Sequence, residues 1–70
     1  MMSKIKEKFG KRLREIRKNK GISQEKLSKR AGFDRTYVGK IERGERSPSL
    51  ETIEKLADAL EVEILELFKF

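Results

Sequence analysis

Apolar residues recur every three or four positions along most of this chain, which is the spacing that places side chains on one face of an α-helix. A first helix is predicted from about Ser3 to Lys18, with Gly21 ending it. Its apolar face comprises Ile5, Phe9, Leu13 and Ile16. No segment alternates between apolar and polar residues with a period of two over a useful length, so no β-sheet is predicted.

Two short helices are predicted next, at about Gln24 to Ala31 and Arg35 to Arg43. Ser23 is an N-cap candidate for the first of them and Asp34 for the second, and Gly32 separates the two. Their shared apolar side comprises Leu27, Ala31, Phe33, Val38 and Ile41. Two short helices joined by a glycine turn and facing one core form a helix-turn-helix by spacing alone.

The remaining apolar residues predict two more helices. Ser49 can cap a fourth helix whose inner face comprises Leu50, Ile53, Leu56, Ala57 and Leu60. A fifth helix is predicted from Glu63 to about Lys69. The expected fold is one compact all-α domain of five helices spanning residues 1–70. Its predicted core combines the inner faces of the first four helices, without Ile5, with Ile22 and Ile64.

Charge divides the chain into two unequal parts. Residues 1–47 hold 16 Lys and Arg against six Asp and Glu, a net charge of +10. Residues 48–70 hold two against six, a net charge of −4. The split predicts a basic surface for a polyanion and an acidic segment with a different role. The alternative is a charged, solvated surface of the kind common on small soluble proteins.

The composition argues against several functional classes. The chain has no Cys and no His, which rules out disulfides and the usual zinc sites. Its carboxylates are scattered and it has no phosphate-binding loop, so we expect no enzyme, no cofactor, no metal and no small-molecule ligand. No apolar run approaches the roughly 20 residues that span a bilayer. We therefore expect a soluble, unprocessed, cytoplasmic protein that is not bound to a membrane.

The outward residues of the second motif helix are candidates for DNA recognition, because that helix lies in the major groove in proteins of this architecture. Arg35, Thr36 and Lys40 carry side chains suited to base edges. Tyr37 is expected to pack its ring on the preceding helix while its hydroxyl reaches the DNA backbone. The alternative is that Arg35 and Lys40 only increase solubility.

Other residues of the motif are candidates for contacts with the sugar-phosphate backbone. Ser23 and Gln24 open the first motif helix, where the helix dipole and unpaired amides favour phosphate. Ser23 can also act simply as an N-cap. Arg43 and Arg46 flank the end of the reading helix and are expected to follow the backbone.

The segments LREIRKNKGISQEKLSKRAG and FDRTYVGKIERGERSPSLETIEKLADALEV resemble the Cro/repressor-type, or xenobiotic-response-element, family of helix-turn-helix regulators. The run DRTYVGKIERGER looks especially like the controller proteins of restriction-modification systems. The resemblance implies a lambda-repressor-like domain that regulates transcription on the nucleoid of a prokaryote, or in a phage.

The resemblance also implies roles for individual residues. Gln24 matches a glutamine that binds phosphate and bases in phage repressors, and Arg35, Thr36 and Lys40 match positions that read the operator. Phage repressors often have glutamines at these positions, so Arg, Thr and Lys imply an operator richer in guanine contacts. Arg17 and Glu42 match residues that form a buried ion pair in related repressors.

The C-terminal segment is a candidate dimerisation element. One reading helix contacts about four base pairs, and a two-fold dimer on a palindrome doubles that readout. The predicted fifth helix carries more apolar residues than one face can bury, and the expected interface comprises Leu65, Leu67, Phe68 and Phe70. The alternative is that these residues close the core of the monomer.

The sequence therefore predicts a homodimeric regulator that binds a palindromic DNA operator. A protein-interaction module, such as an antitoxin or a helical adaptor, is the competing class of function. An adaptor has no need to keep Arg35, Thr36 and Lys40 facing outward together.

Overall fold

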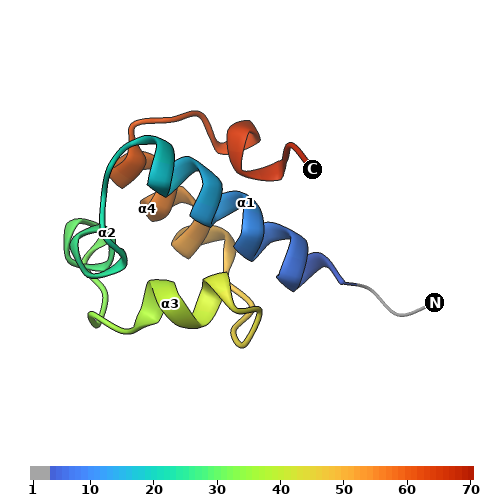
Figure 1. The fold of residues 1–70 in the computed structure, drawn as a ribbon, viewed down its shortest axis with the longest axis horizontal. Helices are drawn as coiled ribbons and strands as arrows, with labels where there is room; N and C mark the ends of the chain where they lie inside the picture. The colour runs from blue at the N-terminus through green and yellow to red at the C-terminus, as the bar shows by residue number, and fades with distance from the viewer. Residues whose placement is uncertain (1–3) are drawn as a thin grey trace.

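The computed structural model describes residues 4–70, which form four α-helices and one 3₁₀ helix (Figure 1). The elements are α1 (Ile5–Asn19), α2 (Gln24–Ala31), α3 (Tyr37–Glu42), α4 (Leu50–Leu60) and η1 (Ile64–Phe68). The all-α prediction is confirmed, with a 3₁₀ helix in place of the predicted fifth α-helix. The predicted start at Ser3 lies outside the described residues. None of the helices within residues 4–70 is long and apolar enough to cross a membrane.

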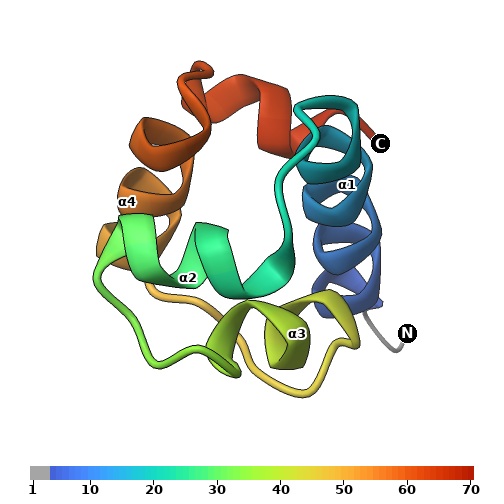
Figure 2. The same cartoon turned by 60° about the vertical axis from the view of Figure 1, so that its left-hand side comes forward.

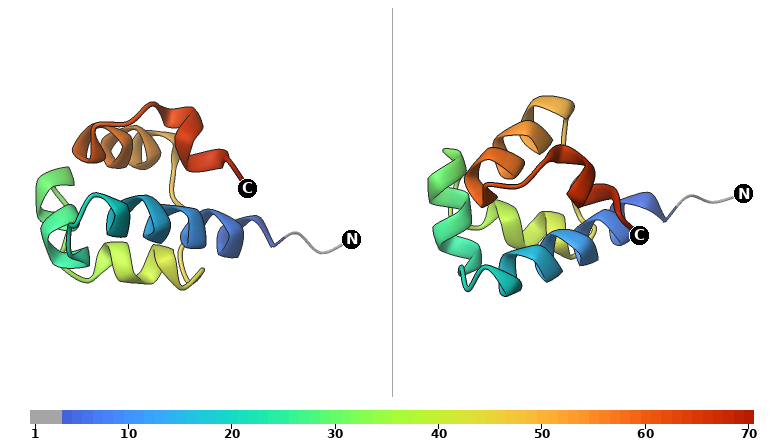
Figure 3. Two further views of the ribbon diagram at one scale, coloured as in Figure 1. Left: turned by 45° about the horizontal axis from the view of Figure 1, so that its top comes forward. Right: turned by 90° about the horizontal axis from the view of Figure 1, so that it is seen from above.

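The five elements close into a ring around one core. α1 packs on α3, α3 on α2, α2 on α4, α4 on η1, and η1 back on α1. Figure 2 shows η1 bridging the ends of α1 and α4, with α2 and α3 across the opposite side. In Figure 3 α1 runs between η1 and α3, so that α3 lies on the far side of the molecule from the C-terminal segment.

The core lies inside this ring and is mostly as predicted. Its buried residues are Phe9, Leu13, Ile16, Leu27, Val38, Ile41, Ile53, Leu56, Ala57, Leu60 and Leu67. Ile22, Ala31 and Phe33 pack against it and are partly buried. Two predicted core residues are wrong, because Leu50 is 81% exposed and Ile64 is 44% exposed. Leu50 is the first residue of α4 and lies at the rim of the core.

Leu67, predicted at a dimer interface, is instead fully buried in the protomer's own core. In an α-helix of 3.6 residues per turn it would lie off the inward stripe. The segment is a 3₁₀ helix that packs against α1 and α4, and Leu67 is the residue of η1 that this packing buries.

The predicted caps of α2 and α4 are present. Ser23 Oγ accepts a hydrogen bond from the Lys26 amide at 3.0 Å, and Ser49 Oγ accepts one from the Thr52 amide at 3.1 Å. Each satisfies an amide that has no partner within its helix. Gly32 follows α2 with φ of +82°, a left-handed conformation that glycine adopts without strain.

α3 is shorter than the helix predicted from Arg35 to Arg43, because Asp34 holds a turn in front of it. Asp34 Oδ1 accepts hydrogen bonds from the Thr36 amide at 2.9 Å and the Thr36 hydroxyl at 2.7 Å. Such Asx turns compete with helical hydrogen bonding. α3 therefore begins at Tyr37, and Arg35 lies in the turn that precedes it.

Gly10 sets how closely α1 and α3 approach each other. A Cβ atom at this position would lie 2.5 Å from the Ile41 carbonyl oxygen and 2.6 Å from that of Glu42. Any larger residue would push α3 away from α1. The hydrophobic pattern of α1 carries no sign of this contact, because glycine is neither clearly apolar nor polar in such a pattern.

Candidate nucleic-acid interface

α3 is anchored to the core on one side and exposed on the other. Val38 and Ile41 are fully buried, and the Val38 amide donates a hydrogen bond to Ser28 Oγ of α2 at 3.2 Å. Ser28 is itself fully buried, so this bond holds α3 on α2 in a site without water competition. Sequence analysis missed Ser28. The only sequence feature that points to a buried role for Ser28 is its position, one residue after Leu27 on the inner side of α2.

The structure gathers part of the predicted DNA-contacting set around one shallow hollow. Gln24, Arg35, Thr36 and Arg43 line it together with Glu25 and Gly39. Lys40, Ser23 and Arg46 are exposed but do not line the hollow. The candidate interface is thus the hollow between α2 and α3 with exposed polar and basic groups around it.

Arg35 is a strongly exposed candidate for base contacts. Its side chain is 77% exposed, and Arg35 Nη1 lies 4.0 Å from Glu25 Oε2. An exposed ion pair at this distance contributes little to stability and is screened by salt. The guanidinium can therefore leave Glu25 for an acceptor on DNA at little cost.

Thr36 and Tyr37 are both held by neighbours. The hydrogen bonds from the side chain and amide of Thr36 lower the pKa of Asp34 below its ordinary value, so the carboxylate is ionised at neutral pH. The Tyr37 ring packs on Phe33 with ring centroids 4.8 Å apart, in a tilted arrangement. The sequence predicted ring packing on the preceding helix, whereas the ring partner Phe33 lies in the turn that follows α2.

Arg17 and Glu42 form a buried ion pair between α1 and α3. Arg17 Nε donates to Glu42 Oε2 at 2.7 Å, and Arg17 Nη2 donates to Glu42 Oε1 at 3.1 Å. Arg17 Nη1 also donates to the Ile22 carbonyl oxygen at 2.7 Å. A third donor reaches Glu42, because Gln24 Nε2 lies 2.9 Å from its Oε1. The pair thus connects α1 and α3 with the first residue of α2.

Arg43 carries a partner that the sequence did not indicate. Arg43 Nε donates to Glu45 Oε2 at 2.6 Å, and both side chains are about half exposed. This bond lowers the pKa of Glu45 and raises that of Arg43. Arg43 must share its guanidinium with Glu45, or leave it, to bind phosphate. Arg46 is exposed and lies in the loop after α3.

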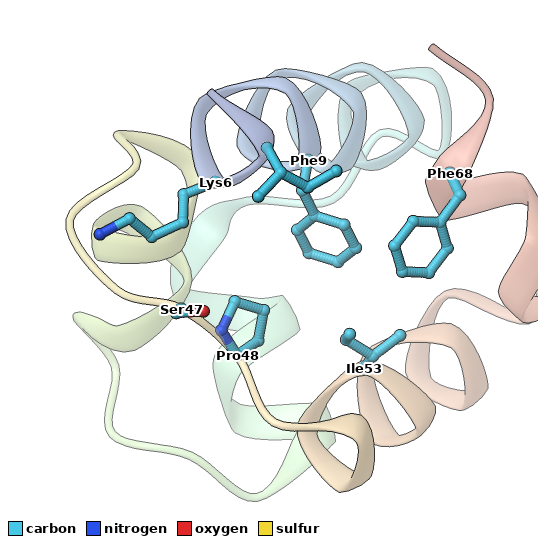
Figure 4. Close-up of a pocket in the computed structure, with 7 residues that line it drawn as sticks. Lys6, Phe9, Ser47, Pro48, Ile53 and Phe68 are labelled. Atoms are coloured by element: carbon cyan, nitrogen blue, oxygen red, sulfur yellow. The ribbon is translucent and has the colours of Figure 1, made fainter. Parts of the chain in front are cut away.

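A second surface, which we call the apolar groove, lies at the end of the molecule that carries η1. Its floor is formed by Phe9, Pro48, Ile53 and Phe68, which converge from α1, the loop before α4, α4 and η1 (Figure 4). The groove continues past Phe68 along Leu50 and Ile64. Of the predicted dimer residues, Phe68 lines this groove. Leu65 and Phe70 are exposed but line neither part of it.

The sequence of this chain is similar to those of known proteins. Residues 13–67 match the family described as "Helix-turn-helix". The control protein C.BamHI of Bacillus amyloliquefaciens is 44% identical over 71 residues, covering all of this chain and 88% of that protein. The control protein C.MunI of a Mycoplasma species is 41% identical over 68 residues, covering 96% of this chain and 92% of that protein.

A solved structure shows the same fold. The crystal structure of the restriction-modification controller protein C.AhdI from Aeromonas hydrophila matches this chain with a TM-score of 0.91 and 55% sequence identity. The match covers 94% of this chain and 100% of the other. The similarity therefore extends over nearly the whole chain and is not confined to the helix-turn-helix.

Proposed function

Because this chain belongs to the helix-turn-helix family, we propose that it regulates transcription by binding a palindromic DNA operator as a homodimer, with α3 in the major groove. The observation that carries this proposal is the hollow between α2 and α3. It places Arg35 and Thr36 beside each other on an exposed surface, at the N-terminal end of a helix whose other side is buried. Lys40 extends the same exposed side by one turn.

We assign base readout to Arg35, Thr36 and Lys40. Arg35 is suited to two hydrogen bonds with O6 and N7 of a guanine, and Lys40 to a guanine or a phosphate. Ser23, with the first amides of α2, is proposed to contact the DNA backbone along with Tyr37, Arg43 and Arg46. These contacts would orient the reading helix without carrying sequence information.

The apolar groove is proposed as the dimer interface. The large apolar residues that remain exposed within residues 4–70 are Ile5, Leu50, Ile64, Leu65, Phe68 and Phe70, and four of these six border the groove. Exposed apolar residues that cluster in this way mark protein contacts. The interface proposed here therefore keeps Phe68, drops Leu67, Leu65 and Phe70, which do not line the groove, and adds Leu50. A second copy bound at this end would leave α3 free for DNA.

We further propose that the protein acts in the cytoplasm, on the nucleoid, as the controller of a restriction-modification system. Support comes from the relatives named as control proteins, which match nearly the full length of this chain. Neither enzymatic activity nor a bound cofactor is part of this proposal. An operator located upstream of the chain's own gene and a restriction endonuclease gene would agree with the controller role.

Selection of binding sites from random duplex DNA tests the function directly. The expected result is an enriched palindrome of two half-sites, bound with an affinity that falls steeply as salt rises because counterions are released from the phosphates. Enrichment of no sequence, or equal binding of all sequences, would overturn the proposal. The protein would then belong with the interaction modules considered above.

A further inference from the structure

The hollow between α2 and α3 has two neutral polar side chains on its wall, Gln24 and Thr36. A glutamine amide carries both donors and an acceptor, and a threonine hydroxyl can act as either. Which role each takes toward DNA depends on what its other side already binds. In this structure a neighbouring carboxylate fixes whether each of these two side chains acts as a donor or as an acceptor toward the hollow.

Gln24 is oriented by Glu42. The Glu42 carboxylate is buried, and both of its oxygens accept hydrogen bonds from Arg17. The group of Gln24 that faces it must therefore be the NH₂ group, and Nε2 lies 2.9 Å from Glu42 Oε1. The side-chain oxygen of Gln24 is left on the opposite side of the amide.

The Gln24 oxygen borders the hollow next to Gly39. A Cβ atom built on Gly39 would lie 3.0 Å from Gln24 Oε1 and 3.1 Å from Arg43 Nη1. Both atoms thus border the space above Gly39, and a larger residue there would fill it. The surface presented to a ligand at this point is a hydrogen-bond acceptor beside a cationic donor.

Thr36 is oriented in the same way by a different residue. Its hydroxyl donates to Asp34 Oδ1 at 2.7 Å, and its amide donates to the same oxygen. The only hydroxyl proton of Thr36 is thus taken, and the side chain offers lone pairs and a methyl group to the hollow. Two acceptors therefore line a hollow flanked by the guanidinium groups of Arg35 and Arg43.

We propose that Glu42 and Asp34 are positioning residues that fix Gln24 and Thr36 as acceptors, so that this hollow takes an exocyclic amino group of adenine or cytosine. The inference rests on the proposed function. In the major groove adenine N6 and cytosine N4 are the amino donors, whereas a phosphate has only acceptor oxygens. In this orientation Gln24 turns its NH₂ group toward Glu42 and its oxygen toward the hollow, which revises the backbone contact expected from the sequence.

The test uses the operator enriched from random DNA and a series of modified duplexes. In one set each adenine becomes purine or each cytosine becomes 2-pyrimidinone, one position at a time, which removes only the amino group. In a second set each phosphate becomes a methylphosphonate. We expect removal of one amino group per half-site to weaken wild-type binding about 5- to 100-fold, the range of one good base contact. The base at that position identifies the donor as adenine or cytosine.

Four variants then assign the effect. Gln24→Ala or Thr36→Val should lose the sensitivity to that amino group while keeping the wild-type response to every methylphosphonate. Asp34→Asn and Glu42→Gln replace an obligate acceptor by an amide that can also donate. They should relax the preference at the same position. Because Asp34 is exposed, Asp34→Asn remains informative if Glu42→Gln fails to fold.

Several results would overturn the inference while leaving the proposed function intact. One is an operator whose amino groups can all be removed singly without loss of affinity. Another is a Gln24→Ala variant that becomes insensitive to one methylphosphonate and keeps its base preference, the behaviour of a phosphate ligand. If no sequence is enriched at all, the proposed function fails and this inference fails with it.

The orientation of Gln24 can also be observed without DNA. Gln24 is the only glutamine and Asn19 the only asparagine, so the side-chain amide region of a ¹⁵N-correlated spectrum contains two pairs of signals. The Gln24 NH₂ protons should exchange slowly with solvent in the wild type and faster in Glu42→Gln, in the free protein and in the complex. Fast exchange in the folded wild type would contradict the orientation.

Discussion

Arg17 and Glu42 face each other across the contact between α1 and α3, joined by two hydrogen bonds of 2.7 and 3.1 Å. Both residues are buried, with Glu42 also bound by Gln24. The pair therefore links the helix that carries the reading surface to the longest helix of the domain. Its geometry and burial lead to the first prediction.

Glu42→Ala should destabilise the protein by about 3–5 kcal/mol, because it leaves the Arg17 charge buried without its counter-ion. Denaturant titration followed by circular dichroism measures the change. The control is Glu45→Ala, which breaks the exposed pair with Arg43 and should leave the unfolding midpoint almost unchanged. A loss below about 1 kcal/mol for Glu42→Ala would mean that solvent reaches the pair.

Gly10→Ala should destabilise the protein by about 1–3 kcal/mol, through overpacking of the contact between α1 and α3. The sign of the change in stability is informative, because the same substitution within an exposed helix stabilises a protein by about 1 kcal/mol. Thermal unfolding measures the effect.

A control for the Gly10 prediction comes from Gly21, where a Cβ atom would meet nothing within 4 Å. Gly21→Ala should cost only the left-handed strain at φ of +71°, about 1–2 kcal/mol. It should also leave DNA affinity unchanged when both proteins are folded, whereas Gly10→Ala should weaken it by displacing α3. Equal DNA affinity for the two folded variants would argue against this role of Gly10.

Arg35→Ala should cost about 1–3 kcal/mol of operator binding and relax the base preference at one position per half-site. Arg46→Ala should weaken binding to operator and random DNA by similar factors and reduce the slope of affinity against salt, as expected for a phosphate contact. Fluorescence anisotropy at several salt concentrations separates the two. If Arg35→Ala lost affinity equally on both DNAs, direct readout by this residue would be excluded.

Leu50→Asp should convert the proposed dimer to a monomer without unfolding it, because Leu50 borders the apolar groove yet is 81% exposed in the protomer. Analytical ultracentrifugation measures the association, and operator affinity should fall in parallel. Phe68→Asp should dissociate the dimer and also lower stability, since Phe68 packs on Phe9 with ring centroids 5.3 Å apart.

Leu67→Asp provides the contrast, because this residue is fully buried within the protomer. It should unfold the protein. Leu65→Asp, on a side chain that lines neither part of the groove, should leave both association and stability near wild type. A wild type that stays monomeric at high concentration would contradict the interface altogether.

The start of α3 should respond to acid through Asp34. Its pKa is lowered in the folded protein, chiefly by the hydrogen bonds from Thr36, so its contribution to stability is present above the unfolded pKa and is lost as pH falls through the folded value. Thr36→Val should raise the pKa of Asp34, which carboxyl NMR detects. No change in this pKa would mean that the Thr36 hydroxyl bond is absent in solution.

The sequence alone determined those features that depend on residues close to one another along the chain. Ser23 and Ser49 cap helices that begin one residue later, and Gly32 ends α2, because capping acts within a single turn. The 3.6-residue spacing also placed most of the core on the correct faces. The exposed candidates Arg35, Thr36 and Lys40 follow from the same local reasoning, since none of them falls on the apolar face of the helix predicted at 35–43.

Only the tertiary structure decided features that depend on distant partners. A 3₁₀ helix packed against α1 and α4 turned Leu67 inward, and the end of the ring left Leu50 exposed. The contact of Gly10 with the α3 carbonyls joins residues about thirty positions apart. Most consequential for function, Gln24 is oriented by a carboxylate 18 residues away. The amide has no local preference for either orientation, so the polarity that it presents to the hollow is set by packing.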